Sequence, residues 1–141
     1  MTPRPLGPDH TPFDALGLEG ATLLAKRFYD HMDAHEPALV ALHRLDESGA
    51  RVAPIVRERF TSFLVEWLGG PPDYSKANGH PRLRMRHGHV PVDIAMRDAW
   101  LRCMDAALED PSVSDEVRGF LKRRFAEVAD FLRNRAEPAE P

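Results

Sequence analysis

Apolar side chains recur at intervals of three and four residues along most of the chain. This spacing places them on one face of an α-helix. Alternation of apolar and polar positions, which would indicate β-strands, is nearly absent. Between residues 18 and 32, the apolar stripe has Tyr29 beside it and consists of Ala21, Leu24, Ala25, Phe28 and Met32. The pattern therefore predicts an all-α protein.

Three further long helices are expected, and residues with known helix-end preferences mark their limits. One runs from Pro54, since proline suits the first turn, to Leu68, where the sequence GGPP ends it. Another spans residues 92–108. The last begins near Ser114, with acidic residues in its first turn where the helix dipole favours them. Its inward positions are expected to be Val117, Leu121, Val128, Phe131 and Leu132.

Shorter elements and two tails complete the expected organisation. Residues 37–42 and 81–87 are predicted to form short helices. Residues 69–80 contain Gly, Pro, Asn and Asp without periodicity and are expected to form a long loop. The Pro-rich start, residues 1–12, and the Pro- and Glu-rich end, residues 135–141, are predicted to be flexible. One domain is therefore expected over residues 13–134.

Composition narrows the class of protein. The chain has 141 residues, of which 43% are apolar and 29% charged, as in soluble globular domains. A net charge of −3 argues against nucleic acid as the partner, because phosphate binding depends on summed positive charge. The single cysteine, Cys103, rules out an internal disulfide framework and fits a reducing compartment. No signal peptide or transmembrane run is evident, so we expect a cytoplasmic protein that does not enter membranes.

The stretch GHPRLRMRHGHV, residues 79–90, concentrates histidine and arginine. A metal site, an anion-binding site, a nucleic-acid patch and a solvated surface are all compatible with it. His87 ends a predicted helix before Gly88, so one ring nitrogen can donate to a backbone carbonyl while the other binds a metal. His80 and His89 do not complete a zinc site, because the spacing is unusual and no cysteine or acidic ligand lies between them.

Neighbouring residues extend the metal-site interpretation. Arginines 82, 84 and 86 flank His87, and Arg59 is a further cation that a ligand with carboxylates could contact. Aromatic residues lie on or beside inward helix faces, and core packing is their default explanation: Tyr29, Phe60, Phe63, Trp67 and Trp100. An apolar slot, one histidine ligand, flanking cations and polar aromatic groups together suggest a haem pocket. A charge run on a solvated surface remains the alternative.

The run FLVEWLGGPPDYSKANGHPRLRMRH…RDAWLRCM, residues 63–104, resembles the truncated haemoglobins of group II. GGP, then Tyr, then GHPRLRMRH, then RDAWLRCM follow one another in that family's order and spacing. The resemblance extends more loosely over residues 13–133, with RFYD at 27–30 matching a segment on the ligand side of the haem. It implies a truncated-globin, two-over-two helical sandwich around haem b.

The resemblance also implies roles for individual residues. His87 matches the proximal ligand of the haem iron. Residues on the opposite, distal side, which stabilise the bound ligand, are Tyr29, Trp100 and His43. Residues lining the haem pocket are Val56, Phe60, Phe63, Leu64, Leu83, Val90 and Met96. Residues that meet the haem propionates are Arg59, Tyr74 and Arg86.

Three departures from the family's usual sequence affect the expected pocket. Gly88-His89-Val90 stands where an apolar-Pro-Phe step is common, which reduces packing on the proximal side. Phe60 replaces a smaller aliphatic residue and should narrow the distal cavity. His43 replaces a phenol or phenyl ring in many members, which raises the hypothesis that it reaches ferric iron or hydrogen-bonds a bound water through Tyr29.

The function implied by the resemblance is reversible binding of O2 and other small ligands, namely CO, NO, cyanide and sulfide. The alternative is a haem-dependent enzyme acting on peroxide, NO or sulfide, for which weak peroxidase or NO dioxygenase-type activity would be the sign. A third interpretation is a helical interaction module whose arginines 82–86 bind an acidic partner. An unidentified reductase is a candidate partner, and both a monomer and a homodimer remain open.

Overall fold

The computed structural model describes residues 6–79 and 93–132. The predicted helix over 81–87 and nearly all of the histidine-arginine stretch lie outside these ranges. The described residues form helices and isolated bridges without a strand, which confirms the all-α prediction. The helices are α1 (Pro12–His35), α2 (Pro37–Val40), α3 (Pro54–Trp67), α4 (Asp73–Asn78), α6 (Ile94–Leu108) and α7 (Asp115–Leu132).

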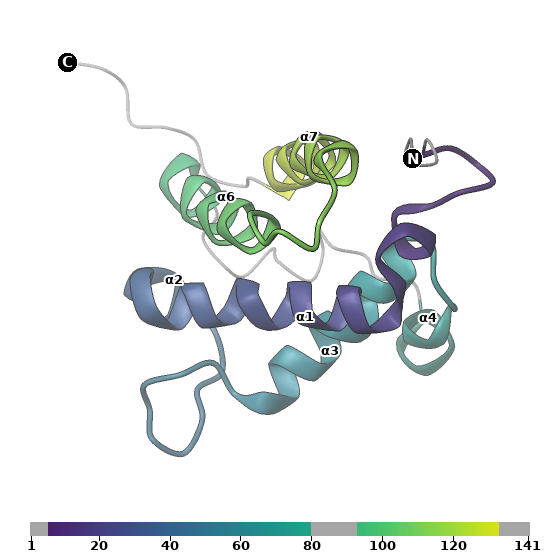
Figure 1. The fold of residues 1–141 in the computed structure, drawn as a ribbon. Helices are drawn as coiled ribbons and strands as arrows, with labels where there is room; N and C mark the ends of the chain where they lie inside the picture. The colour runs from purple at the N-terminus through teal and green to yellow at the C-terminus, as the bar shows by residue number, and fades with distance from the viewer. Residues whose placement is uncertain (1–5, 80–92, 133–141) are drawn as a thin grey trace.

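Helix α1 lies at the centre of the arrangement. In Figure 1, α6 and α7 lie on one side of α1, and α3 lies on the other. The apolar stripe predicted on α1 is buried throughout. Side chains from four helices meet in the core, and the largest that are fully buried include Leu24, Phe28, Met32, Leu64, Met104, Leu108 and Leu121.

Helix α1 begins six residues earlier than the pattern predicts. Thr11 and Asp14 form a capping box: the Asp14 amide donates to Thr11 Oγ1 at 3.1 Å, and the Thr11 amide donates to the Asp14 carboxylate at 3.0 Å. Gly17 has φ 74°, so the helix is kinked between its first turns and the rest. This kink interrupts the periodicity and explains why the pattern shows the helix only from residue 18.

The end of α3 is fixed by a close approach to the start of α1. The amide of Phe13 donates to the carbonyl of Leu68 at 3.0 Å. A Cβ atom at Gly69 would lie 2.6 Å from the Cβ of Thr11, and Gly69 has φ 111°. Only glycine fits this position without strain. The GGPP segment thus ends the helix as predicted and also allows two helices to meet.

Two expectations about secondary structure and burial are wrong. Residues 69–80 were expected to lack regular structure, yet Asp73–Asn78 form α4. Glu66 on α3 fixes this helix, because its carboxylate accepts hydrogen bonds from both the amide and the hydroxyl of Ser75. Six residues are too few to produce a recognisable period. Phe131, expected to point inward from α7, is 57% exposed.

Two classes of structure are absent from the described ranges. None of the helices there is long and apolar enough to cross a membrane. No group of three or more His, Cys, Asp or Glu side chains within residues 6–79 and 93–132 is arranged to hold a metal ion.

Candidate functional site

A cavity of about 510 Å³, here called the inner cavity, lies among the helices. Its wall comes from α1, α2 and the turn after it, α3, α4, α6 and α7. Every predicted site residue within the described ranges lines it: Tyr29, His43, Val56, Arg59, Phe60, Phe63, Leu64, Tyr74, Met96 and Trp100. The predicted site residues Leu83, Arg86, His87 and Val90 lie outside the described residues.

Aromatic rings form much of the inner-cavity wall and the layer behind it. Phe28, in the core, stacks on Phe60 with ring centroids 5.1 Å apart and meets Trp100 edge-on at 5.3 Å. Trp67 stacks on Phe125 of α7 at 4.8 Å. Such contacts hold the rings in fixed orientations. Phe60 and Trp67 are nevertheless only half-buried, although they project from the inward face of α3.

Three aromatic residues of the inner cavity carry an O–H or N–H donor that bonds to no other described residue: Tyr29, Tyr74 and Trp100. Tyr29 is only 3% exposed, yet no described residue accepts a hydrogen bond from its hydroxyl group. The indole N–H of Trp100 likewise has no acceptor within the described ranges. The arrangement therefore favours a ligand that brings an acceptor into the cavity.

Tyr29 is suited to act as a donor because it keeps its proton. Burial raises the pKa of its hydroxyl far above the usual value for tyrosine, while the nearby Arg57 guanidinium opposes this rise and Asp33 adds to it. The group is consequently neutral at physiological pH. It can donate its single O–H to an acceptor in the cavity.

His43 lies in the turn after α2, with its ring edge-on to Tyr29 at a centroid distance of 6.1 Å. Its Nδ1 lies 2.8 Å from the carbonyl oxygen of Leu39, which can only accept a hydrogen bond. Nδ1 therefore carries the proton when the ring is neutral, and Nε2 is an acceptor or metal ligand. This tautomer is compatible with the hypothesis that His43 binds ferric iron.

Three arginines line the inner cavity, and their pairing differs. Arg97 is bonded to Asp98 and, at 2.9 Å, to Asp130; these hydrogen bonds raise its pKa. Neither Arg44 nor Arg59 forms an ion pair with a residue that the structure describes. Both are exposed at the rim, so they can meet carboxylates of a ligand. Arg44 was missed by the sequence analysis, because its loop has no periodicity to place it.

Sequence reasoning also missed most of the contribution of α7. Phe125, Val128, Ala129 and Leu132 line the inner cavity at intervals of three and four residues. Val128 and Leu132 had been predicted to point inward, as part of a stripe that fills the core. Periodicity identifies an inward face but does not distinguish packing from the lining of a hollow. The other lining residues missed were Leu39, Leu42 and Arg97, while Trp67 had been named only as an inward-facing aromatic residue.

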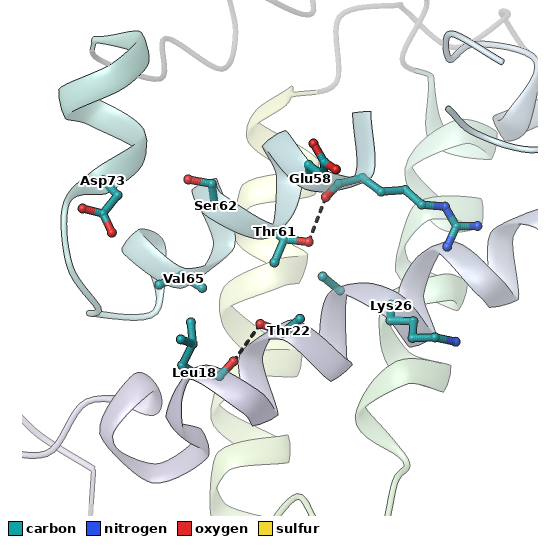
Figure 2. Close-up of a pocket in the computed structure, with 10 residues that line it drawn as sticks. Leu18, Thr22, Lys26, Glu58, Thr61, Ser62, Val65 and Asp73 are labelled. Atoms are coloured by element: carbon teal, nitrogen blue, oxygen red, sulfur yellow. Dashed lines mark hydrogen bonds between the residues drawn. The ribbon is translucent and has the colours of Figure 1, made fainter. Parts of the chain in front are cut away.

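A second hollow, here called the outer cleft, has a volume of about 490 Å³ and lies between α1 and α3 beside α4 (Figure 2). None of the predicted site residues lines it. The hydroxyls of Thr22 and Thr61 donate to the carbonyl oxygens of Leu18 and Arg57 in their own helices, each at 2.8 Å. Lys26 is paired with Asp30 at 2.6 Å. These polar groups are thus already bonded within the protein.

The sequence profile of the bacterial-like globins matches residues 11–134. The chain belongs to this globin family. A group 2 truncated hemoglobin of Bacillus subtilis (strain 168) is 34% identical over 128 residues, which are 91% of this chain and 92% of the relative. The group II truncated haemoglobin predicted from the sequence is confirmed.

Solved structures of relatives agree with this assignment. A cold-adapted truncated hemoglobin from Pseudoalteromonas haloplanktis TAC125 superposes with a TM-score of 0.81 at 36% identity, covering 89% of this chain and 99% of that one. A group II 2-on-2 hemoglobin from Agrobacterium tumefaciens gives a TM-score of 0.77 at 31% identity, covering 95% and 98%. The two-over-two truncated-globin fold is therefore confirmed.

Membership of the globins implies a haem, and the inner cavity fits such a group. Its volume lies within the range of about 300–1,000 Å³ that is usual for ligand and cofactor sites. Its wall is mainly apolar and aromatic, as a flat apolar ring system requires. The unused donors of Tyr29 and Trp100 and the two arginines at the rim supply polar groups for a ligand and for propionates.

Proposed function

We propose that this globin binds haem b in the inner cavity and uses it to bind O2 and other diatomic ligands reversibly. The observation that carries the proposal is an apolar cavity lined by the donor groups of Tyr29 and Trp100, neither of which is hydrogen-bonded to a described residue. Haem b would supply an iron with an open coordination position for O2, CO, NO, cyanide or sulfide.

The residues that would hold the haem are assigned by the family resemblance. His87 would be its axial ligand, and Leu83 and Val90 would pack against the ring. Arg59, Tyr74 and Arg86 would meet the propionates. We add Arg44 to the proposed propionate contacts, because its side chain lines the same cavity and forms no ion pair with a described residue.

Tyr29 and Trp100 would retain a ligand that carries partial negative charge, as O2 does in this setting. Each hydrogen bond from a neutral donor to a charged acceptor contributes about 1.5–3 kcal/mol. That energy slows ligand release by about one to two decades per bond. A structural relative with 33% identity and a TM-score of 0.77, from Bacillus subtilis, is described as a truncated oxygen-avid haemoglobin, which supports this role.

Absorption spectra of the wild type and of His87→Ala test the proposal. We expect the purified wild type to show a strong Soret band that shifts on reduction with dithionite and again on addition of CO. His87→Ala should lose haem or change its ligation. A colourless wild-type protein that takes up no added haem would refute the proposal.

A second candidate function is haem-dependent chemistry on peroxide, NO or sulfide, and the position of His43 favours it. Its Nε2 is an acceptor in the neutral ring, so it can take a proton from a ligand in the inner cavity. Peroxide turnover well above that of free haem, lost in His43→Ala, would establish this function. A ferric spectrum and pH titration that are the same in His43→Ala would exclude ligation by this residue.

The remaining expectations stand as proposals. A cytoplasmic location fits the single cysteine, Cys103, which is buried in α6. A reductase would be needed to return a ferric haem to the ferrous state, so such a partner is proposed. Monomer and homodimer remain alternatives, and so do the predicted boundaries of the globin domain and its tails.

A further inference from the structure

Arg57 joins the outer cleft to the inner cavity. It projects from α3 and lines the outer cleft, whereas Tyr29 lines the inner cavity. The guanidinium carbon of Arg57 lies over the Tyr29 ring, 5.4 Å from its centroid. A cation over an aromatic face attracts the ring, and partial desolvation strengthens the attraction. Arg57 and Tyr29 therefore touch across the boundary between the outer cleft and the inner cavity.

Two carboxylates on α1 hold the guanidinium in place. Nη1 lies 3.0 Å from Oδ1 of Asp30, and Nη2 is bonded to the carboxylate of Asp33. Asp33 is itself fixed, because its Oδ1 accepts a hydrogen bond from the amide of Val52 at 3.1 Å. The planar guanidinium bonded to two carboxylates has little freedom to turn.

Other rings enclose the remaining sides of Tyr29. Phe60 meets it at a centroid distance of 5.5 Å and an interplanar angle of 86°, and His43 at 6.1 Å and 88°. Phe28 lies 4.9 Å away at 72°. These contacts are edge-on and uncharged when His43 is neutral. Arg57 thus supplies the cationic contact on the face of the ring.

We infer that Arg57 is a positioning residue for ligand binding, which holds the Tyr29 ring in the wall of the inner cavity without touching the ligand. This role rests on the proposed function, since Tyr29 must donate to the ligand for its position to affect release. Asp30 and Asp33 act through Arg57. Without the guanidinium, the ring would gain freedom on the side of the outer cleft, and its hydroxyl would meet the ligand less often.

Fluorine NMR tests the position of the ring directly. The chain has two tyrosines, Tyr29 and Tyr74, so protein labelled with 3-fluorotyrosine gives few signals, and Tyr74→Phe assigns them. We expect Arg57→Ala to shift the Tyr29 fluorine signal. Faster flipping of the freed ring should also merge the signals of its two flip states into one, while the Tyr74 signal stays in place. Lys26→Met is the matched control, because it removes a cation from Asp30 but leaves the contact between Arg57 and the ring.

The rate of O2 release from the haem-loaded protein tests the consequence. Arg57→Ala should speed release by about three- to tenfold, the equivalent of a partly buried cation–π contact. In a Tyr29→Phe background the same change should add nothing further. Arg57→Lys should give an intermediate rate, because it keeps a cation but engages one carboxylate at a time, and Lys26→Met should match the wild type.

The outcomes separate this inference from the proposed function. Equal acceleration by Arg57→Ala with and without the Tyr29 hydroxyl would overturn the inference, since Arg57 would then act by another route. An unchanged Tyr29 fluorine signal in Arg57→Ala would also overturn it. If Tyr29→Phe alone leaves release unchanged, the donor role in the proposed function fails, while the fluorine spectra still decide whether Arg57 holds the ring.

Discussion

The inner cavity and the outer cleft have nearly the same volume, about 510 and 490 Å³, but differ in chemistry. Helix α3 contributes to both hollows from opposite faces, since successive residues turn by 100°. Its cavity face carries Val56, Phe60, Phe63, Leu64 and Trp67, with Arg59 at the edge, and its cleft face carries Arg57, Glu58, Thr61, Ser62 and Val65.

The comparison shows that volume alone does not identify a binding site. In the outer cleft, the hydroxyls of Thr22 and Thr61 are bonded to their own helices (Figure 2). In the inner cavity, the donors of Tyr29 and Trp100 have no acceptor within the described residues. The outer cleft also has polar side chains without a described partner, namely Glu58, Ser62 and Asp73, but none of its lining residues is aromatic, so it lacks the flat apolar wall that a haem requires.

Truncating one leucine in each hollow should give the largest contrast, in stability. Leu64 lines the inner cavity and is fully buried, whereas Leu18 lines the outer cleft and is 62% exposed. We expect Leu64→Ala to lower the free energy of unfolding by about 2–5 kcal/mol. Leu18→Ala should change it by less than about 0.5 kcal/mol. Urea denaturation measures both, and equal losses would show that the cleft is as tightly packed as the cavity.

Removing hydroxyl or N–H groups from each hollow should separate their roles in ligand binding. Tyr29→Phe and Trp100→Phe should each speed O2 release by about one to two decades, since each removes a hydrogen bond to the ligand. Thr22→Val and Thr61→Val serve as controls and should leave the rate unchanged. Stopped-flow measurement of O2 release decides this. No acceleration in either aromatic variant would remove both donors from the mechanism.

Filling each hollow with a bulky ring should show which one takes the haem. Val128→Trp places an indole at the edge of the inner cavity, and Ser62→Trp places one in the outer cleft. Overpacking costs about 1–3 kcal/mol, so Val128→Trp should weaken haem binding by about one to two decades. Ser62→Trp should leave it unchanged. The rate of haem transfer to an excess of another apo-globin reports the difference, and weakening by both variants would contradict the assignment.

Charge pairs beside the outer cleft should give the smallest effect, limited to acid stability. Burial would raise the pKa of Asp30, but hydrogen bonds from Lys26 and Arg57 outweigh it and hold the pKa below its usual value of 3.8. Because the folded-state pKa is the lower one, the pair stabilises the protein above about pH 4 and ceases to do so as the pH falls through the folded-state value.

Asp30→Asn tests this dependence. At pH 6 the variant should be less stable than the wild type by about 0.2–1 kcal/mol, as is usual for exposed ion pairs. The difference should shrink at pH 3, where the carboxyl of the wild type is increasingly protonated. Urea midpoints at the two pH values measure it. A difference that grows on acidification would show that Asp30 does not stabilise the fold as a carboxylate.

How far the sequence predicts this structure depends on the length of each pattern. The stripe on α1 repeats over several turns and is buried as predicted. The stripe on α3 predicts its inward face, but only Leu64 of that face is buried, because the face lines the inner cavity. Helix α4 is a short segment fixed by Glu66, a residue that no local pattern connects with it. Phe131 was expected on the inward face of α7 but is 57% exposed, whereas its neighbour Leu132 lines the inner cavity, because the period alone does not define the edge of the inward face.

The candidate site likewise contains residues that the sequence could predict and residues that it could not. Tyr29, Trp100 and the other cavity residues named in advance came from motifs whose order and spacing resemble a known family. Arg44 and the α7 stripe were missed, since neither belongs to those motifs. Arg57 was missed as well, because its contact with Tyr29 joins residues 28 positions apart. Their relevance depends on helices that come together only in the fold.

The sequence by itself determined the all-α class, the principal helices and the membership of the truncated globins. These follow from local periodicity, helix-end residues and motifs that lie within single segments. Only the tertiary structure decided which inward-facing residues fill the core and which line the inner cavity, and that Arg57 lies over Tyr29. The physical reason is that burial and electrostatic contact depend on distances between separate helices, and those distances are set by the packing of the whole chain.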